Sequence, residues 1–162
     1  MAVQVAVCGP RDATVDERDV AHRIGQLLAE RGAVVICGGG SGVMAAVAAG
    51  ARSRRGLVVA IRPGDGRPGD GRAGAADDLT AVVVTNMGEA RNAVVVWSAD
   101  AVIVVGGSWG TLSELALAMR RGGVPVVSVG GWRVVDVDGH EIPGIAHVTT
   151  PEEAVRLACP AS

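Results

Sequence analysis

Six short, nearly continuous apolar runs recur along the chain, and longer segments rich in alanine, leucine and charged residues separate them. The runs cover residues 3–8, 33–37, 57–61, 81–84, 101–105 and 124–129. A strand with one face in water alternates apolar and polar residues, whereas an uninterrupted apolar strand is typical of a parallel sheet covered on both faces. The pattern therefore predicts strands that helices bury on both sides.

The segments between these runs have the composition of helices. They cover residues 16–31, 42–54, 88–98 and 111–121. A short last helix is expected after Thr150, which can cap it while Pro151 occupies its first turn. Strands that alternate with helices predict right-handed crossovers. We therefore expect one doubly wound α/β domain over residues 1–162, with a mostly parallel sheet of about six or seven strands.

Two segments interrupt the alternation of strands and helices. Residues 63–72 read PGDGRPGDGR, and glycine and proline at this density predict a flexible loop over residues 62–78. The alternative is a lid that brings Arg62, Arg67 or Arg72 towards an anion. Residues 132–142 form the second interruption, and the Asp138–Gly139 pair inside it predicts a hairpin at a sheet edge or an oligomer contact.

The composition excludes several classes of chemistry. The chain has no lysine, because all 15 basic residues are arginine. A Walker A loop and a Schiff base with pyridoxal phosphate both need a lysine amine, so both are excluded. Phenylalanine and tyrosine are also absent, which leaves three tryptophans and argues against extended stacking of nucleic-acid bases.

Charge, cysteine content and the N-terminal residues bear on the expected partners and location of the protein. A formal net charge of -2 argues against a general nucleic-acid binder. The three cysteines and three histidines show no metal-ligand spacing, so we expect no disulfide, no metal site and no cofactor. We expect no signal peptide, because the first residues lack a basic segment followed by a long apolar stretch, and no membrane span, because no apolar run approaches about 20 residues. A reducing cytoplasm is the expected location.

Glycine-rich turns follow three of the predicted strands. Ligands of open parallel sheets bind at the carboxyl ends of the strands, and the start of a helix there presents unpaired amides to a phosphate. Tight packing of a helix on its strand would need glycines too, and this alternative stays open for each loop. The candidate ligand-binding residues are Gly9 and Pro10 after the first strand, Gly38, Gly39, Gly40, Ser41 and Gly42 after the second, and Gly106, Gly107, Ser108, Trp109, Gly110 and Thr111 after the fifth.

The dinucleotide fingerprint is not present. Its GxGxxG motif should follow the first strand, where Gly9 stands alone. The acidic residue that should end the second strand is also missing, since Cys37 and Gly38 occupy that place. A nicotinamide dehydrogenase is therefore disfavoured.

Arg91 and Glu114 are the candidate catalytic residues, because each lies early in a helix that follows a strand. The arginine could bind a phosphate or carboxylate, and the glutamate could accept ribose hydroxyls or assist cleavage at an anomeric carbon. Two structural alternatives remain. Glu114 could fold back as part of a capping box that starts at Thr111, and Arg91 could form a surface or interface ion pair with Glu89 or Asp100. The tryptophans are expected in the core or an interface, with Trp109 inside the glycine loop as the exception.

Three segments resemble a known superfamily over nearly the whole chain. They read CGGGSGVMAAVAAGA, NMGEARNAVVVWSADAVIVVGG and GGSWGTLSELALA. These segments are similar to the Rossmann-like superfamily of the Lonely Guy phosphoribohydrolases, long mislabelled lysine decarboxylases, which includes DNA-processing protein A and the molybdenum cofactor carriers. The closest likeness is to a short bacterial branch of that superfamily.

The resemblance implies a function and a role for each matching residue. The phosphoribohydrolases carry PGGxGTxxE and hydrolyse the N-glycosidic bond of a nucleoside 5′-monophosphate to a base and ribose 5-phosphate. By resemblance, the glycine loop before Thr111 would hold the phosphate, and Arg91 and Glu114 would form the catalytic pair. Met44, Asn92 and the loop after the second strand would line the ligand pocket.

The chain also departs from that pattern. Val105 stands where the signature has proline, an indole occupies the loop, and Asn92 follows the arginine where the family usually has lysine. The alternative function is a non-catalytic carrier or sensor of a phosphorylated ligand such as the molybdenum cofactor. A third hypothesis, an interaction module in a DNA-linked system, is the one least compatible with the net charge.

The expected partners are a small phosphorylated ligand and a second copy of the chain. Members of the superfamily pair through the helix that carries the arginine. In this chain that helix contains the apolar run from Val94 to Trp97, which is more than one buried face needs. A homodimer or higher homo-oligomer is therefore expected.

Overall fold

The computed structural model describes residues 1–64 and 77–160. Its strands are β1 Gln4–Cys8, β2 Val34–Cys37, β3 Leu57–Arg62, β4 Ala81–Val84, β5 Ala101–Val105, β6 Val126–Val129 and β7 Ala146–Val148. Its helices are α1 Val15–Glu30, α2 Val43–Ser53, the 3₁₀ turn η1 Gly88–Ala90, α3 Arg91–Trp97, α4 Trp109–Arg121 and α5 Pro151–Ala158. The loop predicted over residues 62–78, with Arg67 and Arg72, lies mostly outside the described residues.

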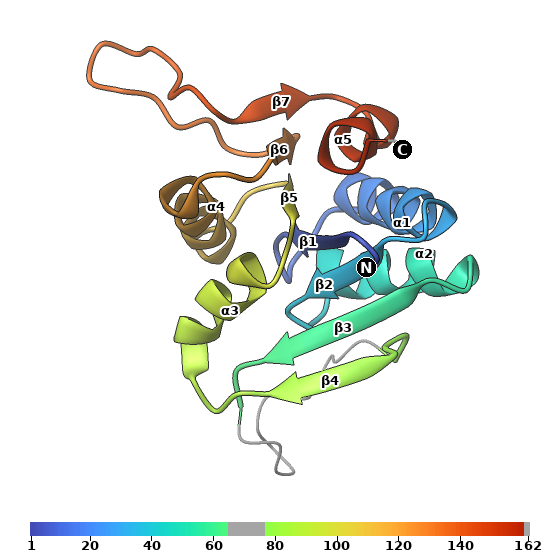
Figure 1. The fold of residues 1–162 in the computed structure, drawn as a ribbon. Helices are drawn as coiled ribbons and strands as arrows, with labels where there is room; N and C mark the ends of the chain where they lie inside the picture. The colour runs from blue at the N-terminus through green and yellow to red at the C-terminus, as the bar shows by residue number, and fades with distance from the viewer. Residues whose placement is uncertain (65–76, 161–162) are drawn as a thin grey trace.

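All seven strands run parallel in one sheet, in the order β4-β3-β2-β1-β5-β6-β7 (Figure 1). The order reverses between β1 and β5, so the chain winds outwards in two directions from the middle of the sheet. The predicted doubly wound α/β architecture is confirmed. An open sheet of this kind places its ligand site beyond the carboxyl ends of the strands at this reversal.

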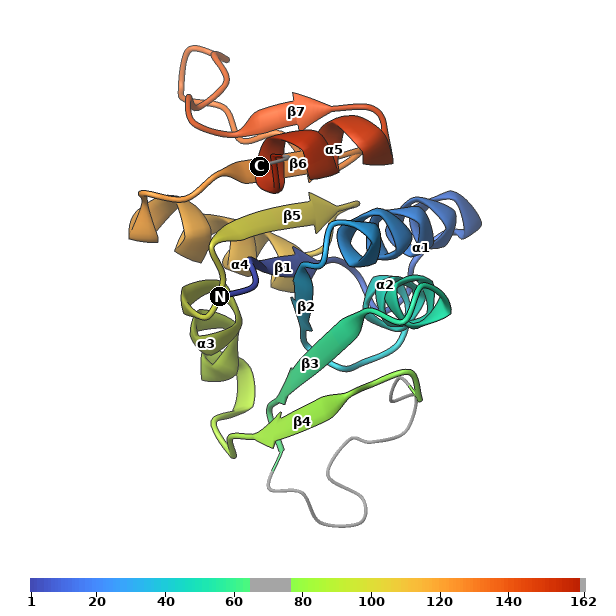
Figure 2. The same ribbon diagram turned by 45° about the vertical axis from the view of Figure 1, so that its right-hand side comes forward.

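Helices cover both faces of the sheet. α1, α2 and α5 lie on one face, and α3 and α4 lie on the other, as Figures 1 and 2 show. Side chains of each strand alternate between two cores: Val5 and Val7 pack under the first set of helices, Ala6 and Cys8 under the second. Both faces of the central strands are buried, as continuous apolar runs predict.

The two edge strands differ from the sequence prediction. All four residues of β4 are exposed, so the prediction that this run is buried on both faces is wrong. An edge strand has a neighbour on one side only, and the main helix contacts on this side of the sheet fall on β3 rather than β4. The opposite edge strand, β7, is not among the predicted strands. It is three residues long and has His147 at its centre, so it does not form a continuous apolar run.

The segment between β6 and β7 forms the predicted hairpin. Val135 and Glu141 make an antiparallel bridge, and the amide of Asp136 donates to the carbonyl of His140 at 2.9 Å. Gly139 has a φ of 83° at the turn, a left-handed conformation that favours glycine. Figure 1 shows this hairpin projecting from the body of the domain beside β7.

No helix in residues 1–64 and 77–160 has both the length and the apolar character needed to cross a bilayer.

The close crossing of α1 and α2 depends on glycine. A Cβ on Gly50 would overlap the carbonyl oxygen of His22. We expect Gly50→Ala to lower the free energy of unfolding by about 3 kcal/mol in urea titrations, because overpacking forces the helices apart. The matched control is Gly110→Ala in α4, where a Cβ would lie 3.9 Å from its nearest neighbour. That change should raise the stability by about 0.5 kcal/mol. Equal effects of the two substitutions would contradict the assignment of Gly50.

Candidate functional site

A pocket of about 620 Å³ lies at the carboxyl ends of β1 and β5, on the side of the sheet that carries α3 and α4. Such a volume is in the range of small-molecule sites. The β1–α1 loop, the starts of α2, α3 and α4, and the end of β3 all contribute. Its lining residues are Gly9, Pro10, Arg11, Asp12, Met44, Pro63, Glu89, Arg91, Asn92, Gly107, Ser108, Gly110, Thr111 and Glu114.

The start of α4 presents helix amides to this pocket. Ser108 is the N-cap, and its hydroxyl accepts a hydrogen bond from the amide of Thr111 at 3.2 Å. α4 therefore begins two residues earlier than the sequence predicted. The first amides of a helix have no partner within the helix and carry a partial positive charge. This end of α4 can bind an anion.

The start of α2 is occupied by protein. The amide of Val43 donates to the carbonyl of Pro10 at 3.1 Å, and Gly42 has a φ of 65°. A Cβ on Gly42 would overlap the carbonyl oxygens of Pro10 and Arg11. The glycine loop after β2 is thus packed against the β1–α1 loop, as its packing alternative predicts. Of the two helix starts that follow glycine loops, the start of α4 can bind an anion better than the start of α2.

Arg91 is the first residue of α3 and is buried, with 8% of its surface exposed. Its Nε and Nη1 are buried without a hydrogen-bond partner among the described residues. The guanidinium lies against Gly38, where a Cβ would overlap it. Burial lowers the pKa of Arg91, while the carboxylate of Glu114 opposes this shift. The site thus holds a buried cation with two unused donors.

Glu114 lies one turn into α4 and is equally buried. Burial raises the pKa of its carboxyl to about 7, although Arg91 and a hydrogen bond with the Cys8 thiol both favour the ionised form. Burial also raises the pKa of Cys8 well above its ordinary value, and the neighbouring Glu114 adds to that shift. At neutral pH the glutamate can therefore hold or release a proton.

The capping box for Glu114 and the surface ion pair for Arg91 are wrong, whereas an interface ion pair of Arg91 stays open. Ser108, not Thr111, caps α4, so Glu114 is not the reciprocal residue of a capping box. Arg91 is buried rather than at the surface, and the carboxylate of Asp100 instead accepts the amide of Gln4 at 2.9 Å. The side chains of Arg91 and Glu114 both line the same pocket.

A model of the SLOG cluster4 family matches residues 2–155. The chain belongs to the SLOG cluster4 family. A relative in Archaeoglobus fulgidus, described as an uncharacterized protein, is 39% identical over 165 residues and covers 99% of this chain and 97% of its own.

Two solved structures are similar to this SLOG cluster4 chain. The molybdenum cofactor binding protein of Rippkaea orientalis is 30% identical, with a TM-score of 0.82 over 97% of this chain and 95% of its own. DNA processing protein A of Streptococcus pneumoniae is 19% identical, with a TM-score of 0.72 over 95% of this chain and 61% of its own, and shares the fold. The resemblance stated from the sequence motifs is confirmed.

The SLOG cluster4 pocket gathers only some of the candidate residues. Those that line it are Gly9, Pro10, Met44, Arg91, Asn92, Gly107, Ser108, Gly110, Thr111 and Glu114. Those outside its lining are Gly38, Gly39, Gly40, Ser41, Gly42, Gly106 and Trp109. Four lining residues were not predicted: Arg11, Asp12, Pro63 and Glu89. Arg11 and Asp12 directly follow Gly9–Pro10, and this glycine turn was the available signal for them.

The tryptophans do not lie in the core. Trp97 and Trp109 are 62% and 79% exposed, and Trp132 is exposed as well. The rings of Trp109 and Trp132 meet edge to face, with centroids 5.1 Å apart. A Cβ on Gly107 would overlap the Trp132 ring, so this glycine lets the indole cover the β5–α4 loop. All three cysteines are buried free thiols.

The raised pKa of Glu114 predicts a pH-dependent stability. The folded protein favours the protonated carboxyl, so this stabilisation is present at acid pH and is lost as the pH rises through about 7. The free energy of unfolding of the wild type, compared with that of Glu114→Gln, should fall by about 2 kcal/mol between pH 5 and pH 8 in urea titrations. The surface variant Glu30→Gln should follow the wild type. A constant difference between wild type and Glu114→Gln would contradict the shift.

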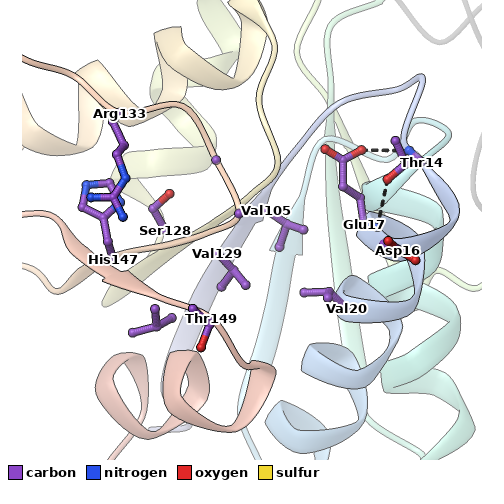
Figure 3. Close-up of a pocket in the computed structure, with 13 residues that line it drawn as sticks. Thr14, Asp16, Glu17, Val20, Val105, Ser128, Val129, Arg133, His147 and Thr149 are labelled. Atoms are coloured by element: carbon purple, nitrogen blue, oxygen red, sulfur yellow. Dashed lines mark hydrogen bonds between the residues drawn. The ribbon is translucent and has the colours of Figure 1, made fainter.

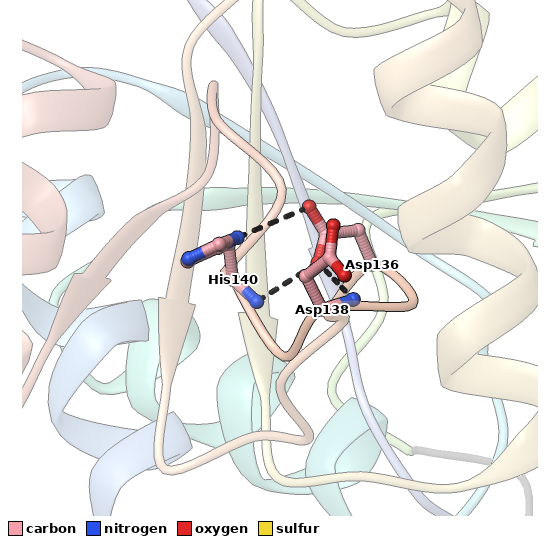
Figure 4. Close-up of side chains that lie close together, drawn as sticks. All are labelled: Asp136, Asp138 and His140. Atoms are coloured by element: carbon pink, nitrogen blue, oxygen red, sulfur yellow. Dashed lines mark hydrogen bonds and ion pairs between the residues drawn. The ribbon is translucent and has the colours of Figure 1, made fainter.

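A second group of titratable side chains lies in the exposed hairpin. Ligand atoms of Asp136, Asp138 and His140 lie within 4.8 Å of one another (Figure 4). The Asp136 carboxylate accepts hydrogen bonds from the amides of Asp138 and His140, each at 2.9 Å. These bonds hold the turn of the hairpin, and they account for the cluster without an ion.

Proposed function

We propose that the pocket between α3 and α4 binds a small phosphorylated ligand. The observation that carries this proposal is the buried guanidinium of Arg91, whose Nε and Nη1 lack a partner among the described residues. A buried donor without an acceptor costs about 1–3 kcal/mol. An anionic ligand would supply the acceptor, and a guanidinium can hold a phosphate through two parallel hydrogen bonds.

The ligand phosphate lies at the start of α4 in this proposal. The unpaired amides of the first turn, the hydroxyls of Ser108 and Thr111, and the positive charge of Arg11 and Arg91 surround the same pocket. Lysine is absent from the chain, so arginine supplies the charge. The ribose would extend towards Glu114, which lines the same pocket and is buried.

The proposed ligand is a nucleoside 5′-monophosphate, and the proposed reaction is hydrolysis of its N-glycosidic bond. Water forms a bond to C1′ while the C1′–N bond breaks and its electron pair moves to the base. Glu114, with a pKa of about 7, gives its proton to the departing base and regains one from the attacking water. The products are the free base and ribose 5-phosphate, and Arg91 holds the phosphate throughout.

A second candidate function is carriage of a molybdenum cofactor without chemistry. The observation that favours it is the 30% identity with the molybdenum cofactor binding protein of Rippkaea orientalis over nearly the whole chain. The pterin phosphate of that cofactor would use the same anion site. This function requires binding that survives the loss of the Glu114 carboxyl.

A ligand screen with a turnover assay tests both functions. Purified protein is heated with nucleoside mono-, di- and triphosphates, ribose 5-phosphate and pterin phosphates, and each hit is assayed for released base by chromatography. A ligand that binds the folded state raises its melting temperature. A monophosphate that raises it and releases base supports hydrolysis. A shift without turnover supports carriage, and no shift with any of these compounds contradicts both.

We also propose that the protein is cytoplasmic. There, two copies of the chain would pair through α3. Val95 and Val96 of this helix are buried in the domain, whereas Trp97 is exposed and lies 5.3 Å from the Arg121 guanidinium. Exposed Val82, Val83 and Val84 of β4 add apolar surface at the sheet edge nearest this helix. Light scattering should show a dimer that Trp97→Arg converts to a monomer; a monomeric wild type would contradict the pairing.

A further inference from the structure

We propose a second ligand site in this protein, distinct from the Arg91 pocket, that binds a small zwitterion whose opposite charges are separated by roughly 10 Å. The site is a pocket of about 540 Å³ at the carboxyl ends of β5, β6 and β7, against the start of α1 (Figure 3). It shares no lining residue with the Arg91 pocket. The two pockets lie on either side of the Gly106–Gly107 turn.

Ser128 is the first sign that this pocket has a ligand. It interrupts an otherwise all-valine strand, it is 1% exposed, and its hydroxyl has no hydrogen-bond partner among the described residues. Alanine at this position would avoid the cost of burying an unpaired hydroxyl. Packing alone therefore does not explain a serine here, whereas an acceptor or donor on a ligand would.

One end of the pocket can bind an anionic group. Ser128 pairs with His147 of β7 in the sheet, so their side chains are neighbours on one face. Figure 3 shows Arg133 and His147 side by side next to Ser128. Arg133 also forms an ion pair with Glu141 of the hairpin, which holds the guanidinium at this end of the pocket. A hydroxyl, an imidazole and a guanidinium together suit a carboxylate.

The other end is acidic. Glu17 of α1 accepts the amide of Thr14 through Oε2 at 2.8 Å, which leaves Oε1 turned towards the end of β5. A Cβ on Gly106 would overlap Oε1, and Gly106 has a φ of 65°. Asp16 adds a second carboxylate at this end. Two carboxylates beside an open pocket suit an ammonium group.

The distance between the two ends sets the size of the ligand. Glu17 lies against the end of β5 and His147 lies in β7, so two strand spacings, roughly 10 Å, separate them. Val20, Val105 and Val129 line the pocket on the α1 face of the sheet, whereas Ser128 and His147 project from the other face. A ligand that reaches both charged ends therefore passes over the carboxyl end of β6. The charges of an α-amino acid are too close together to reach both ends. A short peptide of three residues spans about the right length.

Calorimetric titration with trialanine tests the second site. We expect saturable binding with a dissociation constant below about 10 mM, and at least 5-fold weaker binding of N-acetyl-trialanine and of trialanine amide. Alanine itself should bind weakly. Trialanine that does not bind, or blocked peptides that bind equally well, would overturn the proposal.

Two variants assign the binding to these residues. Glu17→Gln keeps the capping box, which accepts glutamine as well as glutamate. This substitution should weaken the binding of trialanine at least 5-fold. Ser128→Ala should weaken it while leaving the urea midpoint unchanged or higher, since an unpaired buried hydroxyl is removed. Binding that is unchanged in both variants would sink the assignment. Arg91→Met, which alters only the first pocket, should bind trialanine like the wild type, so the two sites succeed or fail separately.

Discussion

Replacement of Arg91 by methionine is expected to weaken binding of a nucleoside 5′-monophosphate by at least about 100-fold in calorimetric titrations. The buried guanidinium has two donors without partners among the described residues. Each hydrogen bond to a charged group contributes about 1.5–3 kcal/mol, and two of them account for this loss. Methionine fills a similar volume, so the folded state should persist without the buried cation.

Lysine at the same position separates charge from geometry. Arg91→Lys keeps the positive charge but loses the planar fork, and we expect it to recover only part of the affinity. Arg18→Met removes an exposed arginine from α1 and is the matched control. It should bind the ligand like the wild type. Equal affinities of wild type and Arg91→Met would show that Arg91 does not hold the phosphate.

Replacement of Glu114 by glutamine is expected to lower the rate of base release by at least about 100-fold, with little change in ligand affinity. Glutamine is nearly isosteric with glutamate but cannot transfer a proton. General acid catalysis contributes about 10²–10⁴ to a rate, so its loss has an effect of this size. Released base is measured by chromatography under saturating ligand, which reports kcat rather than binding.

The wild-type pH profile provides an independent test of the same residue. The proton donor is the protonated carboxyl, so kcat should fall as the pH rises through about 7. Residual activity in Glu114→Gln should not show this step. The control is Glu30→Gln, which removes an exposed carboxylate paired with Arg54. A wild-type kcat that is flat from pH 5 to pH 9 would exclude Glu114 as the acid.

The two variants together separate binding from chemistry. In a hydrolase, Arg91→Met loses affinity and Glu114→Gln loses turnover. In a carrier, Arg91→Met still loses affinity, while Glu114→Gln binds like the wild type and no turnover exists to lose. A pocket that serves neither role would show no ligand at all, in either variant or in the wild type.

Much of the fold was accessible from local sequence patterns. Continuous apolar runs predicted six of the seven strands. Five of these six are interior strands, and an interior parallel strand has two buried faces; the sixth, β4, is an exposed edge strand. Helix α5 was predicted from Thr150 and Pro151, since a cap and a first-turn proline act within a few residues. The start of α4 was predicted two residues late, because Ser108 and Thr111 are both good caps and only the observed hydrogen bond distinguishes them.

The sequence by itself determined the alternation of strands and helices, the glycine turns at the strand ends, and the absence of any lysine chemistry. These properties depend on residue type and on neighbours within a few positions. Only the tertiary structure decided that the loop after β2 is packed against protein while the start of α4 faces a pocket. Strand order brings Arg91 and Glu114 to one pocket, and burial there shifts the pKa of the glutamate to about 7. Burial depends on residues that are distant along the chain, so no local pattern contains it.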